Sequence, residues 1–226
     1  MPNSSNPAIA SLQARIFQCV IVDNDMTLVD SNPGIISSWG TWISEHGIDQ
    51  FLLSDKAGMS TSAIVAELIP DEDSWEQALK RIDDLELEFA YQTTALPGSE
   101  RLLKKLPDSR LAVASSGTHP IIRARIQAAG LSLPTHIVSS DDVERAKPAP
   151  DIFLFAAALL GFEPADCLVI EDSQNGLAAG RAAGCATLAL TTSHPADELI
   201  ADGIVNTLGD VQWLVTDHGV QVELAQ

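Results

Sequence analysis

The sequence predicts an α/β fold in which a doubly wound parallel sheet carries an inserted α-helical domain. Three observations predict it. Short apolar runs alternate with amphipathic stretches, several of these stretches end at a glycine, and one long stretch has helical patterns only. Regular alternation of strand and helix implies right-handed crossovers and a parallel sheet with helices on both faces.

Five apolar runs are predicted to be fully buried strands, namely 17–23, 110–116, 136–140, 167–172 and 185–191. Between them, apolar residues recur at three- and four-residue spacing, which predicts helices over 99–106, 120–129, 150–160 and 175–183. Gly130, Gly161 and Gly184 follow three of these segments, where helices commonly end.

The stretch 32–96 breaks this alternation. It holds helical patterns at 33–46, 60–69 and 74–93, and no strand is predicted between 32 and 95. Because it is too long for an ordinary connection, we expect a helical cap with its own small core. The core domain then comprises 17–31 and 97–226, and residues 1–16 are expected to form a loose tail.

The chain has 226 residues with 13 basic and 31 acidic side chains, a formal net charge of −18, and 46% hydrophobic residues. That apolar content is enough for a full core and excludes a disordered chain. The negative charge argues against binding nucleic acid or an anionic membrane through general electrostatics. An anionic substrate therefore requires a local source of positive charge.

Cys19, Cys167 and Cys185 are odd in number, widely spaced and set in apolar runs, so we expect buried, reduced thiols in a cytoplasmic protein. No apolar run approaches the roughly 20 residues of a membrane span. The first residues lack the basic and apolar regions of a signal peptide, so none is expected.

Residues able to carry chemistry lie at, or shortly after, the carboxyl ends of four of the predicted strands. They are Asp23 and Asp25, Ser115 and Ser116, Lys147, and Glu171 and Asp172. In an open parallel sheet, ligands bind beyond the carboxyl ends of the strands, so these side chains are expected to share one crevice.

Crowded carboxylates at Asp23, Asp25 and Asp172 would repel one another by several kcal/mol unless a cation lay between them. Oxygen ligands with room for water favour Mg²⁺ over Zn²⁺ or Ca²⁺. With Lys147, this ion supplies the local positive charge, and the turn 115–118 offers hydroxyl and N–H donors to a phosphate. The combination indicates phosphoryl transfer through an aspartyl-phosphate.

Four segments carry a family resemblance: DNDMTLVDS (23–31), AVASSG (112–117), AKPAPD (146–151) and VIEDSQNG (169–176). In this order they resemble the motifs of the haloacid dehalogenase-like (HAD) hydrolase superfamily, in the subfamily whose helical cap follows the first strand of a Rossmann-like core. Met26 and Ala146 stand where the family usually has glycine, and Asn24 where it usually has an apolar residue.

The resemblance implies a role for each motif residue. Asp23 would be the nucleophile and an Mg²⁺ ligand; Asp25 would protonate the leaving oxygen and then activate water, while its backbone carbonyl binds the ion. Lys147 would be a catalytic residue that neutralises the phosphate and orients Asp23. The remaining expected roles are phosphate binding by Ser115, Ser116 and Thr27, and metal binding by Asp172 and Glu171.

A second acid at position 25 favours a phosphatase or mutase over a dehalogenase. The segments 96–106, 115–131 and 183–195 resemble phosphatases of small polyol or sugar phosphates, which favours a small phosphorylated metabolite, with glycerol 3-phosphate first. A β-phosphoglucomutase-like enzyme is less favoured because Ile35 replaces a family histidine and Met59 follows Gly58 where a basic residue is usual. Phosphoglycolate phosphatase and a catalytically silent relative that binds a phosphate ligand remain open.

The cap segment 58–62, with Gly58 and Met59, is expected to face the substrate, although an ordinary helix N-terminus explains it as well. The acidic run 71–88 is interpreted as a solvated helix face, and no role is assigned to His119 or His194. We expect a monomer or weak homodimer.

Overall fold

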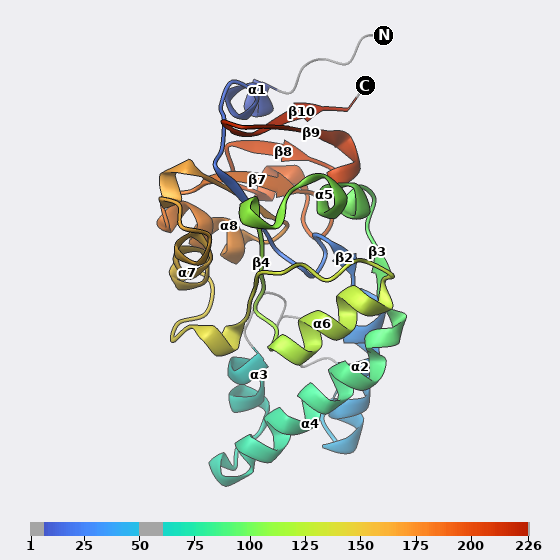
Figure 1. Ribbon diagram of the computed structural model, residues 1–226. Helices are drawn as coiled ribbons and strands as arrows, with labels where there is room; N and C mark the ends of the chain where they lie inside the picture. Colours follow the sequence, from blue (N-terminus) through green and yellow to red (C-terminus); the bar gives the residue numbers. More distant parts are fainter. Residues whose placement is uncertain (1–6, 50–60, 226) are drawn as a thin grey trace.

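Six parallel strands form the central sheet of the part of the chain described by the computed structural model, residues 7–49 and 61–225 (Figure 1). In spatial order they are β5 (Ile137–Val138), β4 (Leu111–Ala114), β1 (Cys19–Val22), β6 (Cys167–Glu171), β7 (Ala186–Leu190) and β8 (Gly203–Val205). The five predicted strands and the predicted α/β class are confirmed. Strand β8 was not predicted, because its three residues Gly-Ile-Val give too short an apolar signal.

Helices cover both faces of this sheet, because successive side chains of each strand point to opposite faces and are mostly apolar on both. In β1, Val20 and Val22 point to one apolar cluster, whereas Cys19 and Ile21 point to another on the opposite face. The second cluster is completed by helices α7 (Asp151–Leu160) and α8 (Gln174–Ala182). The first includes residues of α5 (Ser99–Lys105) and α6 (His119–Ala128).

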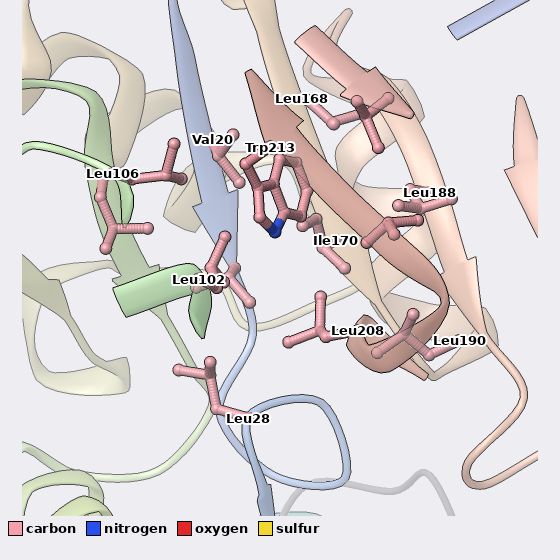
Figure 2. Close-up of a cluster of buried hydrophobic side chains, with 14 of the residues drawn as sticks. Val20, Leu28, Leu102, Leu106, Leu168, Ile170, Leu188, Leu190, Leu208 and Trp213 are labelled. Carbon is pink, nitrogen blue, oxygen red and sulfur yellow. The ribbon is translucent and has the colours of Figure 1, made fainter. Parts of the chain in front are cut away.

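Two further elements close the first cluster. A hairpin of β9 (Val211–Thr216) and β10 (Gly219–Leu224) contributes Trp213, whose ring lies among leucine side chains (Figure 2). Helix α1 (Pro7–Gln13) lies beside it at the same end of the molecule (Figure 1) and buries Ile9 and Leu12. The expected loose tail is therefore wrong for residues 7–13, because these two apolar side chains pack into the core.

The inserted segment is helical and has its own apolar cluster. It contains α2 (Asn32–Glu45), α3 (Thr61–Leu68) and α4 (Trp75–Glu88), followed by a short 3-10 helix at Phe89–Gln92. Trp42 is fully buried in that cluster and donates its indole N–H to the carbonyl of Ala78 at 2.9 Å. Helix α4 also packs against α6 of the core, which places the cap beside the central sheet (Figure 1).

The cap joins the core through a short antiparallel ribbon. Strand β2 (Val29–Asp30) pairs with β3 (Thr94–Ala95), so that Val29 lies opposite Ala95. Strand β3 falls within the stretch where no strand was predicted, because two residues are too few to show an alternation of apolar and polar side chains. Among the described residues, no helix combines the length and apolar composition needed to cross a bilayer.

Gly98, just before α5, packs directly against the backbone of Leu208. Its φ is +91°, and a Cβ atom there would lie 2.2 Å from the Leu208 carbonyl carbon. We expect Gly98→Ala to lower the free energy of unfolding by about 3 kcal/mol or more, since left-handed strain and a backbone clash act together. Urea unfolding measures this loss.

Gly130→Ala is the matched control, because Gly130 also has positive φ (+71°) but no heavy atom within 4 Å of the added Cβ. Its cost should be about 1 kcal/mol. Equal losses in the two variants would contradict the packing described for Gly98.

Candidate active site

The loop after β1 carries the first motif and turns tightly. The carbonyl of Asn24 accepts backbone N–H groups of Thr27, Leu28 and Val29 at 3.3, 2.9 and 3.0 Å. Met26 takes the left-handed conformation that glycine normally supplies (φ +58°), at a cost of about 1 kcal/mol. Its carbonyl accepts a hydrogen bond from the Thr192 hydroxyl, which holds the loop against the segment after β7. Met26 therefore does not prevent the turn.

Asn24 lies on the core side of this loop. Its side chain is fully buried, and neither atom of its amide has a hydrogen-bond partner among the described residues. An unpaired buried amide costs about 1–3 kcal/mol, which accounts for the apolar residue that the family usually has there.

Lys147 joins two of the strand ends. Its ammonium group lies 2.6 Å from Asp23 Oδ1, 2.6 Å from Glu171 Oε1 and 3.1 Å from the carbonyl oxygen of Ala114. Burial alone would lower the pKa of Lys147, but the carboxylates of Asp23 and Glu171 outweigh it and raise that pKa above its ordinary value. The ammonium therefore stays protonated and supplies the positive charge that the acidic chain lacks overall.

The carboxylates of Asp23, Glu171 and Asp172 are buried and offer oxygen atoms that lie within 4.8 Å of one another. Burial and the neighbouring charge of Glu171 raise the pKa of Asp172 to about 7, although hydrogen bonds from Ser193 and Thr27 oppose the shift. Burial likewise raises the pKa of Asp23, against the opposing charge of Lys147. Three buried oxygen donors at this spacing fit a hard divalent cation.

Glu171 is held more firmly than the other two acids. Its Oε2 atom accepts the backbone N–H groups of Asp172 and Ser173 at 3.0 Å and the Ser173 hydroxyl at 2.9 Å. A Cβ atom on Gly176 would lie 1.8 Å from Oε1, so only glycine permits this approach of α8. Because Oε1 also contacts Lys147, Glu171 has the fewest free lone pairs and suits an outer position beside the ion.

The second motif lies where β4 meets α6. Ser115 is buried, and its hydroxyl accepts the N–H of Gly117 at 3.4 Å. Ser116 and Thr118 line a cavity of about 630 Å³ together with Lys147. Helix α6 begins at His119, whose backbone N–H donates to Asp141 Oδ2 at 3.1 Å, and Pro120 has no N–H, so the first two positions of this helix offer no free N–H to an anion.

That cavity lies between core and cap. Asp25, Ala146 and His194 line it from the core, and the cap supplies Thr61, Ser62, Leu79, Asp83 and Glu86. Gly58 and Met59, predicted to face the substrate, lie outside the described residues. Thr61 and Ser62 do line the cavity, as expected for the end of the segment 58–62.

Other details differ from the expectations. Thr27, predicted to bind phosphate, is fully buried and donates to Asp172 Oδ1 at 3.2 Å, so it orients a candidate metal ligand. His119, to which no role was assigned, has its Nε2 atom 2.8 Å from Asp142 Oδ2 and is not among the residues that line the cavity. The acidic run is not simply a solvated face, because Asp83 and Glu86 turn inward on α4.

Arg125, in the middle of α6, was not predicted. Its side chain is 5% exposed, with Nη1 3.0 Å from Asp25 Oδ1 and Nη2 3.0 Å from Glu86 Oε2. Sequence spacing gives no signal for this contact, since the three residues lie on segments far apart in the chain. Burial raises the pKa of Glu86, and the charge of Arg125 opposes that shift.

Asp172→Asn is expected to stabilise the metal-free protein more at pH 8 than at pH 5. A carboxyl with a pKa of about 7 in the fold and about 3.9 unfolded binds its proton more tightly when folded. Its contribution to the free energy of unfolding therefore falls as the pH rises between these values. Urea unfolding in a chelator at both pH values measures the difference.

Asp217→Asn, at an exposed turn, is the control and should change stability equally at both pH values. A stabilisation by Asp172→Asn that is the same at pH 5 and pH 8 would contradict the crowding of acids at this site.

Comparison with known proteins agrees with this geometry. The model of the haloacid dehalogenase-like hydrolase family matches residues 20–190. Hexitol phosphatase A of Escherichia coli is 35% identical over 193 residues, which cover 78% of this chain and 83% of that protein. Glycerol-1-phosphate phosphohydrolase 2 of Saccharomyces cerevisiae is 26% identical over 216 residues, covering 88% and 83%.

A solved structure gives the same result. A hydrolase from Pseudomonas syringae superposes with a TM-score of 0.74 at 26% identity, covering 85% of this chain and 95% of that one. The family resemblance carried by the four motifs is confirmed. The chain belongs to the haloacid dehalogenase-like hydrolase family, and the two relatives named here are phosphatases.

Proposed function

We propose that this protein is an Mg²⁺-dependent phosphatase of small phosphorylated polyols or sugars, with glycerol 3-phosphate favoured, and that it works through an aspartyl-phosphate on Asp23. The observation that carries the proposal is the buried ammonium of Lys147, 2.6 Å from Asp23, beside a cavity that Asp25 also lines. A carboxylate nucleophile, a cation and a second acid are the groups that phosphoryl transfer to a carboxylate needs.

In the first step, Asp23 attacks phosphorus and the bond to the leaving oxygen breaks. Asp25 gives its proton to that oxygen, which leaves as the alcohol. Lys147 and the donors of Ser115 and Ser116 hold the phosphoryl oxygens, and a divalent cation, when bound, would neutralise part of their charge.

In the second step, water attacks the aspartyl-phosphate while Asp25 takes one of its protons. The bond from phosphorus to Asp23 breaks, inorganic phosphate forms, and the Asp23 carboxylate is restored. The proton that Asp25 gives up in the first step is thus replaced in the second.

Asp23, Asp172 and the backbone carbonyl of Asp25 are the proposed ligands of the ion, with Glu171 beside them. Their oxygen atoms fit Mg²⁺ better than a metal that favours nitrogen or sulfur. The carboxylates lie close together and buried, an arrangement that a divalent cation would relieve.

The charges of the cavity wall support an uncharged organic group. Asp83 and Glu86 line the cap side. Among the described lining residues, the arginine and lysine side chains are Arg125 and Lys147, and each is already paired with two carboxylates. A second phosphate, as in a mutase, or the carboxylate of phosphoglycolate would meet these acids without a free cation.

The names of the two relatives support the same class. One is a hexitol phosphatase and the other a glycerol-1-phosphate phosphohydrolase, and both names refer to the phosphate ester of an acyclic polyol.

Phosphate release from glycerol 3-phosphate, a hexitol phosphate, phosphoglycolate and β-glucose 1-phosphate tests the proposal. We expect the two polyol esters to have the highest kcat/KM, with activity lost in a chelator and restored by Mg²⁺. The rate of phosphate release by Asp23→Asn should fall to the uncatalysed background, because the nucleophile is gone, while the circular dichroism spectrum stays unchanged. Asp217→Asn, at an exposed turn, should retain wild-type activity.

Turnover by the Asp23→Asn variant would contradict the nucleophile assignment. Saturable binding of these esters without phosphate release by the wild type would support the alternative, a silent ligand-binding relative.

Asp83→Asn tests the acidic wall. Removing one negative charge from the cavity should raise kcat/KM for phosphoglycolate relative to glycerol 3-phosphate by about fivefold, which is the order of one screened charge interaction. Asp84→Asn removes the neighbouring charge, which faces outward with a side chain 48% exposed and pairs with Lys80. An equal change of the ratio in both variants would show that overall charge, not the wall, sets the preference.

A further inference from the structure

Arg125 lies on the core helix α6 and contacts two other parts of the molecule. One nitrogen of its guanidinium lies 3.0 Å from Asp25 on the loop after β1, and another lies 3.0 Å from Glu86 on cap helix α4. All three residues line the same cavity. The guanidinium is thus a shared partner of the proposed proton-transfer group and of the cap.

Burial makes this contact specific. The Arg125 side chain is 5% exposed, Glu86 11% and Asp25 23%, so water reaches the arginine least and the aspartate most. A buried guanidinium requires partners for its charge, and its planar fork donates a hydrogen bond to Glu86 while its contact with Asp25 is an ion pair. Rotation of Arg125 toward one partner would draw it away from the other. The position of the Asp25 carboxyl is therefore tied to the position of α4.

We propose that Arg125 is a positioning residue that holds the Asp25 carboxyl for proton transfer and makes this position depend on docking of the cap through Glu86. The inference rests on the proposed function, since it needs Asp25 to be the acid and base. It goes further by linking the chemical step to the cap through a residue that the four motifs do not contain. The cap then acts on the reaction as well as on the choice of substrate.

The test uses two esters with different leaving groups. Glycerol 3-phosphate needs its leaving oxygen protonated, whereas 4-nitrophenyl phosphate releases a stable phenolate and needs this far less. Hydrolysis of the aspartyl-phosphate requires Asp25 for both esters. With the alkyl ester, misplacement of Asp25 should therefore slow both the phosphorylation of Asp23 and the later hydrolysis of the aspartyl-phosphate. With the aryl ester, it should slow the hydrolysis alone.

Arg125→Lys keeps the charge and removes the fork. We expect kcat for glycerol 3-phosphate to fall by about tenfold or more, a part of what general acid catalysis contributes, while KM changes by less than about threefold. With 4-nitrophenyl phosphate, rapid mixing should show a burst of about one nitrophenolate per active site, followed by slow turnover.

Glu86→Gln perturbs the link from the cap side and leaves the pair of Arg125 with Asp25 in place. It should lower kcat for glycerol 3-phosphate by a few-fold and should also produce a nitrophenolate burst with 4-nitrophenyl phosphate. This variant also carries the test if Arg125→Lys fails to fold, which thermal unfolding will reveal. Arg123→Lys, at an exposed position on the same helix, is the matched control and should behave as the wild type.

The outcomes separate the inference from the proposed function. A folded Arg125→Lys variant that keeps the wild-type kcat for glycerol 3-phosphate, or that shows no nitrophenolate burst with 4-nitrophenyl phosphate, overturns the positioning role. If Arg125→Lys does not fold, a Glu86→Gln variant with the wild-type kcat for glycerol 3-phosphate and no burst overturns the link to the cap. A wild-type chain that releases no phosphate from any ester overturns the proposed function and this inference together.

Discussion

A buried ammonium between acids is the contact on which the rest of this site depends. Lys147 arrives from the loop after β5 and meets Asp23 and Glu171 at the ends of β1 and β6. Without it, buried carboxylates would face one another in a region where water screens charge poorly. Because β1 lies between β4 and β6, the strand order of the sheet brings these groups together. In a chain with a net charge of −18, this ammonium places one positive charge at the carboxyl ends of the strands.

The central part of the site could be predicted because parallel strands place their carboxyl ends at one edge. An apolar run in the sequence marks each of the strands concerned, and the site residues lie at or after the ends of these strands, namely Asp23, Lys147, Glu171 and Asp172. Arg125 could not be predicted in this way. An arginine on an amphipathic helix usually faces solvent, and its partners come from a distant loop and from the cap. Pairing across three segments is visible only after folding.

The missed parts of the fold have similar causes. Strands β2, β3 and β8 are too short to show a period, and α1 has seven residues with only a few apolar positions. The hairpin β9–β10 did carry a signal, since Val220 and Val222 alternate with polar residues after the turn at 217–218. Read as a strand pair, that pattern would have completed the apolar cluster around Trp213.

The ribbon of β2 and β3 has a consequence for how such a molecule diversifies. It brings both ends of the inserted segment to adjacent backbone positions, where Asp30 lies opposite Thr94. A foreign helical segment whose ends are equally close can be transplanted between these two points without disturbing the register of the sheet. New specificities can then arise by exchange of one module, while the ancestral chemistry beneath it is inherited unchanged.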